Sequence, residues 1–160
     1  MSLAKVRNLS ESYPAVPASI TLARRRLNRF AAAAGAPEEQ LDAITLAVSE
    51  ALTNVVLHAY RDRSGGRIDV VAAVADDELW VLIADEGSGL QPRQDSPGLG
   101  VGLAMIAAVS DGMEVVTRSC GGTEVRMRFT LRPPSVAPRQ DLGSAESASS
   151  PASSYFSTTA

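Results

Sequence analysis

The chain has 160 residues, of which 45% are hydrophobic, so it is long enough for one domain with its own core. Its formal net charge of -3 at pH 7 leaves no positive excess to neutralise a phosphate backbone, and this argues against nucleic acid as a partner. The single cysteine, Cys120, excludes an internal disulfide, and we interpret it as a small strand residue beside two glycines.

The two ends of the chain differ in composition from the middle. Residues 1–10 contain no apolar run typical of a signal peptide, and no apolar stretch approaches the roughly 20 residues of a membrane helix. We therefore expect a cytoplasmic protein without a membrane partner. From residue 133 the chain is rich in serine, alanine and proline, with too little apolar content to offset its ordering entropy. We predict a folded domain over 1–132 and an unstructured tail over 133–160, whose Tyr155 and Phe156 are either stray aromatics or a docking point.

The first third of the chain predicts an edge strand and two helices. Leu3 to Glu11 is a short mixed run that fits an edge strand. Pro14 and Pro17 then open a helix that ends at Gly35, with apolar residues at spacings of three and four: Ile20, Ala23, Leu27, Phe30 and Ala34. Its outer face carries four arginines, which form either a solvated face or a partner-binding patch: Arg24, Arg25, Arg26 and Arg29.

The remaining elements predict a sheet made of hairpins. A second helix begins at Pro37, with acids in its first turn, and runs to about Tyr60. Four strands and one short helix follow it: Arg67 to Ala75, Glu78 to Ala84, the helix Val101 to Val109, Met113 to Arg118 and Glu124 to Leu131. Asp76-Asp77 joins the first two strands, and Gly121-Gly122 joins the last two. This order favours an α+β fold, a two-layer sandwich in which helices cover one face of a mostly antiparallel sheet.

The first candidate motif lies on the second helix. The apolar residues of this helix share one face, which we expect to be the core face: Leu41, Ile44, Val48, Leu52, Val55 and Ala59. The opposite side carries Glu50, Asn54 and His58 among alanines, which indicates a face that something packs against. Asn54 can offer a carbonyl oxygen to Mg²⁺, and Glu50, one turn away, can accept a proton. The Glu-x-x-x-Asn spacing alone is common, so a structural role stays open.

Two glycine-containing motifs follow. Asp85 comes at the end of a predicted strand, before Gly87 and Gly89, where a carboxylate can accept a hydrogen bond from an exocyclic amine such as that of adenine. An ordinary strand-ending turn is the alternative. Gly98, Gly100 and Gly102 precede a predicted helix, whose N-terminal N–H groups can face a phosphate. No Gly-Lys-Ser/Thr sequence follows them, so this is not a Walker A loop, and no βαβ unit surrounds them.

The three motifs together, in this order, resemble the Bergerat ATP-binding fold shared by Hsp90-type chaperones, type II topoisomerases, sensor histidine kinases and mismatch-repair ATPases. Within this histidine-kinase-like ATPase superfamily (GHKL), residues 46–54 with His58-Ala59-Tyr60 resemble the anti-sigma factor serine/threonine kinases of bacteria. The resemblance covers about residues 5–131. The short segment from Leu90 to Pro97 also fits this family, because other branches generally carry longer insertions there.

The resemblance implies ATP and Mg²⁺ as cofactors, Glu50 as general base and Asn54 as metal ligand. It places Asp85 at the adenine amine, with Thr123 near it through water. The glycines would shape the pocket around the base (Gly87 and Gly89) and lie at the phosphates (Gly98, Gly100 and Gly102). His58 would be structural rather than catalytic. Whether Arg93, the one basic residue between the glycine motifs, reaches the phosphates is left open.

The function implied by the resemblance is an ATP-dependent protein serine/threonine kinase. Such a kinase would phosphorylate an anti-sigma factor antagonist of the STAS type and sequester a sigma factor, and members of the family commonly form homodimers. Two alternatives remain: a non-catalytic ATP-gated module that binds a partner, and a stand-alone histidine kinase ATP domain. The presence of Glu50 favours a kinase over the non-catalytic module.

Overall fold

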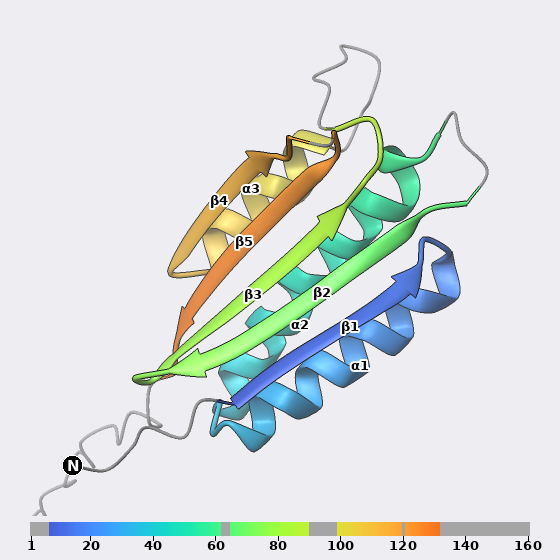
Figure 1. Cartoon of the computed structure of the whole chain (residues 1–160). Helices are drawn as coiled ribbons and strands as arrows, with labels where there is room; N and C mark the ends of the chain where they lie inside the picture. The colour runs from blue at the N-terminus through green and yellow to red at the C-terminus, as the bar shows by residue number, and fades with distance from the viewer. Residues whose placement is uncertain (1–6, 62–64, 90–98, 120, 132–160) are drawn as a thin grey trace, which may run out of the picture.

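The computed structural model describes residues 7–61, 65–89, 99–119 and 121–131. A five-stranded sheet in the order β1-β2-β3-β5-β4 pairs antiparallel throughout, and three helices cover one of its faces (Figure 1). The elements are β1 (Arg7–Pro14), α1 (Pro17–Ala33), α2 (Glu38–Asn54), the π-helical η1 (Val55–Ala59), β2 (Arg67–Ala75), β3 (Glu78–Asp85), α3 (Leu99–Val109), β4 (Gly112–Thr117) and β5 (Thr123–Thr130). The predicted α+β class and two-layer architecture are confirmed.

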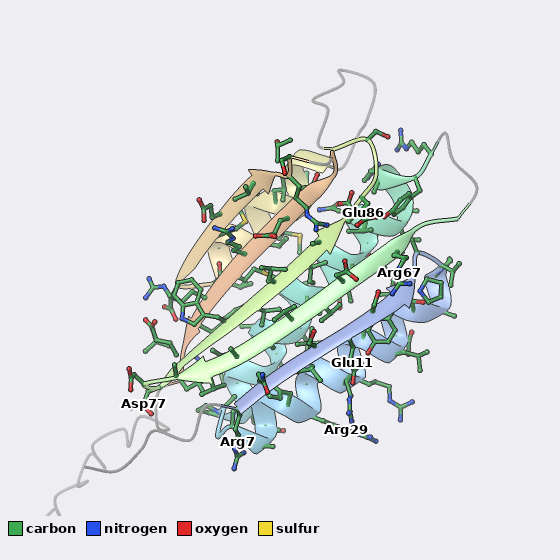
Figure 2. The ribbon with its side chains drawn as sticks, viewed as in Figure 1. Arg7, Glu11, Arg29, Arg67, Asp77 and Glu86 are labelled. Atoms are coloured by element: carbon green, nitrogen blue, oxygen red, sulfur yellow. The ribbon has the colours of Figure 1, made fainter. Side chains whose placement is uncertain are left out.

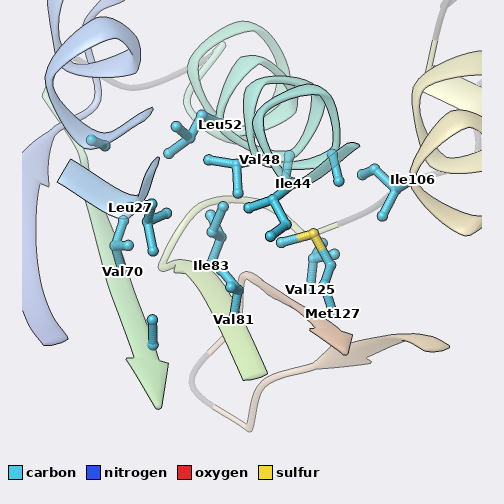
Figure 3. Close-up of a cluster of buried hydrophobic side chains, with 14 of the residues drawn as sticks. Leu27, Ile44, Val48, Leu52, Val70, Val81, Ile83, Ile106, Val125 and Met127 are labelled. Atoms are coloured by element: carbon cyan, nitrogen blue, oxygen red, sulfur yellow. The ribbon is translucent and has the colours of Figure 1, made fainter. Parts of the chain in front are cut away.

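The core lies between α2 and the inner face of the sheet. In Figure 3, Ile44, Val48 and Leu52 of α2 lie over side chains from β3 and β5, which are Val81, Ile83, Val125 and Met127. The alternation predicted for the last strand is confirmed, because Val125, Met127, Phe129 and Leu131 are all buried. The predicted core face of α2 is also confirmed, with Leu41 as a partly buried neighbour of the core.

The predicted hairpin between β2 and β3 is confirmed, and its two-residue loop explains the register. Asp76 and Asp77 both have positive φ, 48° and 63°, while Ala75 pairs with Glu78. Aspartate tolerates this left-handed region, and two positive φ values match the twist of the flanking strands. The register set by this loop ends with Ile68 opposite Asp85, so Asp85 is the last residue of β3.

Two predicted boundaries are wrong, and a third lies outside the described residues. Pro14 ends β1 instead of opening α1, which begins at Pro17; an edge strand can end on a residue that has no N–H to donate. Within the described residues, β1 starts at Arg7, and residues 3–6 of the predicted strand lie outside them. Helix α3 begins at Leu99 rather than Val101, so Gly100 is helical as well as Gly102.

The helical stretch Glu38–Ala59 is more apolar than we expected. It has 22 residues, and an 18-residue window of it has a mean hydropathy of 1.2, enough by length and composition to cross a membrane. The expectation that no stretch approaches this length is therefore wrong. This is weak evidence for a membrane span, because the core helix of a soluble protein passes the same test, and this helix packs on the sheet through Ile44, Val48 and Leu52.

Candidate functional site

Glu50 and Asn54 point toward the first turn of α3. Glu50 Oε2 lies 2.9 Å from the position that a Cβ on Gly102 would occupy, and Asn54 Oδ1 lies 3.5 Å from it. Two alanines next to them on α2, Ala47 and Ala51, are buried. The predicted packing on this face of α2 is thus provided by α3, which approaches closely because Gly102 has no side chain.

Gly100 and Gly102 therefore lie not in a loop before the helix but in its first turn. A Cβ on Gly100 would meet none of the described residues within 4 Å, whereas a Cβ on Gly102 would meet the acid and the amide. The backbone N–H groups of a first helical turn have no intrahelical partner and favour an anion. Gly98 and Arg93 lie outside the described residues.

Asn54 carries a polar atom that the described residues leave without a partner. Its Nδ2 is buried and makes no hydrogen bond there. Leaving such a donor unsatisfied costs about 1–3 kcal/mol, so a bound group that supplies an acceptor would be stabilised at this point. The side-chain oxygen and nitrogen of an asparagine exchange places when the amide group rotates. Asn54 therefore fits a metal ion on the side of its oxygen and an anionic oxygen on the side of its nitrogen.

Asp85 is a buried carboxyl held by main-chain donors. It is 3% exposed, and its Oδ1 accepts a hydrogen bond of 2.8 Å from the N–H of Gly87. Burial raises the pKa of Asp85, while the N–H groups of Gly87 and Thr123 and the charge of Arg118 act in the opposite direction. The contact between Thr123 and Asp85 is thus direct, through the backbone; the water-mediated contact implied by the resemblance stays a prediction.

The loop after β3 is pressed between two other parts of the chain. A Cβ on Gly87 would stand 2.0 Å from the carbonyl oxygen of Ala59, and the N–H of Ser88 donates to that same oxygen at 3.0 Å. On the other side, Gly122 has a φ of 83°, and a Cβ there would stand 2.2 Å from the Asp85 carbonyl oxygen. Gly89 lies beside Gly122 with a φ of 76°. These glycines allow η1 and the β4–β5 turn to approach the end of β3.

The π-helical turn η1 continues α2 directly after Asn54 and carries His58. Nη2 of Arg61 lies 2.7 Å from His58 Nδ1, and because a guanidinium only donates, Nδ1 accepts and Nε2 carries the proton. Burial and the Arg61 charge lower the pKa of His58, which favours its neutral form. This pairing supports the structural role predicted for His58.

Tyr60 connects the site to the sheet. Its hydroxyl accepts a hydrogen bond of 2.9 Å from the N–H of Glu86 and donates one of 2.7 Å to the carbonyl oxygen of Arg67. Glu86 and Arg67 lie at the same end of the sheet, as Figure 2 shows. The hydroxyl therefore fastens the loop after β3 to the start of β2.

We expect Tyr60→Phe to lower the free energy of unfolding by about 1–3 kcal/mol, because the Glu86 N–H and the Arg67 carbonyl oxygen each lose their hydrogen bond to the hydroxyl. Urea unfolding followed by circular dichroism measures this loss. Tyr13→Phe is the matched control and should cost less, because it removes a hydroxyl that bonds to the Glu11 side chain near the sheet edge. An equal loss in the two variants would contradict the role given to Tyr60.

The contact between Gly102 and Glu50 gives a second prediction. Gly102→Ala keeps the domain folded, because alanine favours helix over glycine by about 1 kcal/mol and the atom it meets is the mobile end of Glu50. The new methyl group displaces the Glu50 carboxylate, so we expect a loss of catalytic activity larger than that of Gly100→Ala, whose methyl group would meet none of the described residues within 4 Å. Thermal unfolding and turnover of both variants test this. Equal losses of activity would show that Glu50 is not displaced.

The arginines on α1 are divided between two environments. Arg26 forms an ion pair with Glu11 at 2.7 Å, whereas Arg24, Arg25 and Arg29 line a shallow cavity of about 280 Å³ together with Asn28 and Thr45. The choice between a solvated face and a partner-binding patch stays open.

The structure thus has an acid and an amide on one helix that face a glycine of α3, a buried aspartate at a strand end, and glycines where the backbones meet. The chain belongs to the histidine kinase-like ATPase domain family, whose model matches residues 13–129. It is 33% identical over 130 residues to the serine-protein kinase RsbW of Bacillus velezensis, covering 71% of this chain and 79% of that protein. It is also 29% identical over 119 residues to the anti-sigma F factor of Clostridium acetobutylicum, covering 68% of this chain and 82% of that protein.

The contacts of two side chains at this site, Tyr60 and Arg118, were not predicted from the sequence. Tyr60 appeared only as part of the His-Ala-Tyr ending, and its bridging hydroxyl bonds to residues 7 and 26 positions away. Arg118 donates from Nη1 to the carbonyl oxygen of Asp85 at 3.1 Å, 33 positions away. Neither contact has a local sequence pattern, although the resemblance drew attention to Tyr60.

Proposed function

We propose that this protein is an ATP-dependent protein serine/threonine kinase of the anti-sigma factor type, which phosphorylates an antagonist protein and sequesters a sigma factor. The convergence of Glu50 and Asn54 on the first turn of α3 is the observation that carries the proposal. The names of the relatives, a serine-protein kinase and an anti-sigma factor, support the same activity.

The residues of the site fit a magnesium nucleotide. Asn54 would hold Mg²⁺ through its side-chain oxygen, and its buried nitrogen would donate to an anionic oxygen. Asp85 would accept a hydrogen bond from the adenine amine, with Gly87 and Gly89 bringing backbone close to the base. The N–H groups of the α3 first turn, with Gly98, Gly100 and Gly102, would donate to the phosphates.

In the proposed reaction one side chain of the protein, Glu50, transfers a proton. Bound Mg-ATP supplies the phosphoryl group and the cationic charge that offsets its oxygens. Glu50 accepts the proton of a serine or threonine hydroxyl presented by the partner, and Gly102 leaves the space in which its carboxylate lies. The packed α3 helix and the buried alanines beneath it limit the access of water to this side of α2.

The finer partner assignments rest on the resemblance of the sequence motifs to the anti-sigma factor kinases. We propose that the antagonist is of the STAS type, that the kinase acts as a homodimer and that it works in the cytoplasm. Sigma-factor binding and dimerisation are independent of the proton-transfer step and are tested separately: the first by co-purification with the sigma factor in the presence of ATP, the second by sedimentation of the protein alone.

Label transfer tests the proposed activity. The purified full chain is incubated with γ-labelled ATP, Mg²⁺ and candidate antagonist proteins from the same genome. We expect label on one antagonist that survives acid, as phosphoserine and phosphothreonine do. Acid-labile label would favour the histidine kinase alternative, and ATP-dependent binding without any label would favour the non-catalytic module.

A further inference from the structure

The turn between β4 and β5 closes over the end of β3. The N–H of Arg118 donates to the carbonyl oxygen of Gly122 at 3.2 Å, and the N–H of Gly121 donates back to the carbonyl oxygen of Arg118 at 3.0 Å. Gly121 and Gly122 have φ values of 85° and 83°, in the left-handed region. This turn presses Gly122 against the main chain of Asp85, where a Cβ would stand 2.2 Å from the carbonyl oxygen.

The side chain of Arg118 returns from this turn to Asp85. Its Nη1 donates a hydrogen bond of 3.1 Å to the Asp85 carbonyl oxygen, so the guanidinium lies directly at the residue whose carboxyl is 3% exposed. That carboxyl receives N–H groups from Gly87 and Thr123, on the two sides of the same junction. Arg118 therefore fixes the main chain of Asp85 while the glycine-rich segments fix its side chain.

The charge of Arg118 opposes the effect of burial on Asp85. Burial raises the pKa of this carboxyl, and the N–H groups of Gly87 and Thr123 lower it most. Arg118, with a smaller effect, is the charged side chain that lowers it among the described residues. Two other cationic side chains described near this end of the sheet bond elsewhere: the Arg67 guanidinium bonds to Ser12, and Arg61 bonds to His58. Glu86 is exposed and its N–H donates to Tyr60.

We propose that Arg118 is a positioning residue of the nucleotide pocket: its guanidinium, bonded to the Asp85 carbonyl oxygen, holds the end of β3 in place and sets a positive charge at the residue that accepts from an exocyclic amine. This inference rests on the proposed contact between Asp85 and adenine. An ionised carboxyl only accepts hydrogen bonds, whereas a protonated one presents a donor, which opposes the N–H of an amine. The charge of Arg118 thereby favours a base with an amine at this position over one with a carbonyl oxygen.

The sign of the pH dependence follows from the charge. ATP affinity is full above the pKa of Asp85 and is lost as the pH falls through it. Without the Arg118 charge, less remains to offset the effect of burial on the pKa of Asp85. This pKa therefore rises further, and the loss of ATP affinity begins at a higher pH. A purely structural role of Arg118 would weaken binding by the same factor at every pH.

The first experiment needs no nucleotide. The Asp85 carboxyl carbon is followed by NMR through an acid titration of the ligand-free protein, in wild type, Arg118→Met, Arg118→Lys and Arg126→Met. We expect a higher pKa in Arg118→Met, an intermediate or wild-type pKa in Arg118→Lys, and no change in Arg126→Met, whose arginine pairs with Glu114 and Glu124 instead. An unchanged pKa of Asp85 in Arg118→Met would overturn the proposal.

The second experiment measures ATP affinity of the same variants by calorimetry over a range of pH. For Arg118→Met we expect a deficit that grows to about tenfold toward acid pH, the size of one hydrogen bond to a charged group, and shrinks toward alkaline pH. A deficit of equal size at every pH would show a structural role only and overturn the proposal. Failure of the adenine contact itself is distinguishable, because Asp85→Asn would then bind ATP normally while the NMR shift still reports on Arg118.

Discussion

Replacing Glu50 by glutamine lowers the rate of phosphoryl transfer to the antagonist by about 10²- to 10⁴-fold, the usual contribution of a positioned general base. Glutamine has the same size and cannot accept the hydroxyl proton as a base. Because Glu50 Oε2 lies 2.9 Å from where a Gly102 Cβ would be, the isosteric side chain keeps the packing between α2 and α3. ATP affinity and the free energy of unfolding should therefore stay close to those of wild type.

Glu39→Gln is the matched control for this change. It makes the same substitution on the same helix, at an exposed acid in the first turn of α2. Single-turnover label transfer at saturating ATP measures both variants against wild type. Transfer that persists in Glu50→Gln at the rate of Glu39→Gln would show that Glu50 is not the base.

Replacing Asp85 by asparagine weakens ATP binding by about 10- to 100-fold, the value of hydrogen bonds made to a charged group. The asparagine oxygen can still accept the N–H of Gly87. Its NH₂ group then faces either the Thr123 N–H or the amine of the base. In both cases two hydrogen-bond donors point at each other, and no hydrogen bond forms.

The pH dependence of binding provides a second readout for Asp85. Burial raises the pKa of this carboxyl, so wild-type affinity should fall as the pH decreases through that pKa, whereas Asp85→Asn should lack this dependence. Calorimetric titration with ATP measures both, and Asp42→Asn, an exposed change on α2, serves as control. Equal affinity of Asp85→Asn and wild type would remove Asp85 from the site.

Much of the fold was predictable because its elements bury one face with a regular period. The spacing of Ile44, Val48 and Leu52 on α2 and the alternation along β5 both indicated the buried side correctly. Asp76-Asp77 indicated the hairpin, since two residues that tolerate positive φ fit a two-residue loop. These patterns are local, so one sequence is enough to show them.

The start of α3 was not predictable from local preference. Two glycines disfavour a helix, and we expected it to begin at Val101, but packing against Glu50 and Asn54 selects glycine at position 102 inside the first turn. The π-helical turn after Asn54 likewise has no composition that distinguishes it from an α-helix.

The candidate site was predictable where its residues form motifs and not where they meet across the fold. Glu50, Asn54 and Asp85 were identified by their spacing to helix turns and glycines. Arg118 comes from a turn 33 positions beyond Asp85, and only the antiparallel pairing of β3 with β5 brings the two together. The roles of these residues toward ATP and Mg²⁺ remain predictions.

Mass spectrometry of the antagonist after incubation with this protein, ATP and Mg²⁺ tests the kinase assignment most directly. We predict that the intact mass of the antagonist increases by one phosphoryl group, that fragmentation places it on a serine or threonine, and that Glu50→Gln nearly abolishes the increase. An antagonist that binds in the presence of ATP but keeps its original mass, or one that carries the phosphoryl group on histidine, would contradict the assignment.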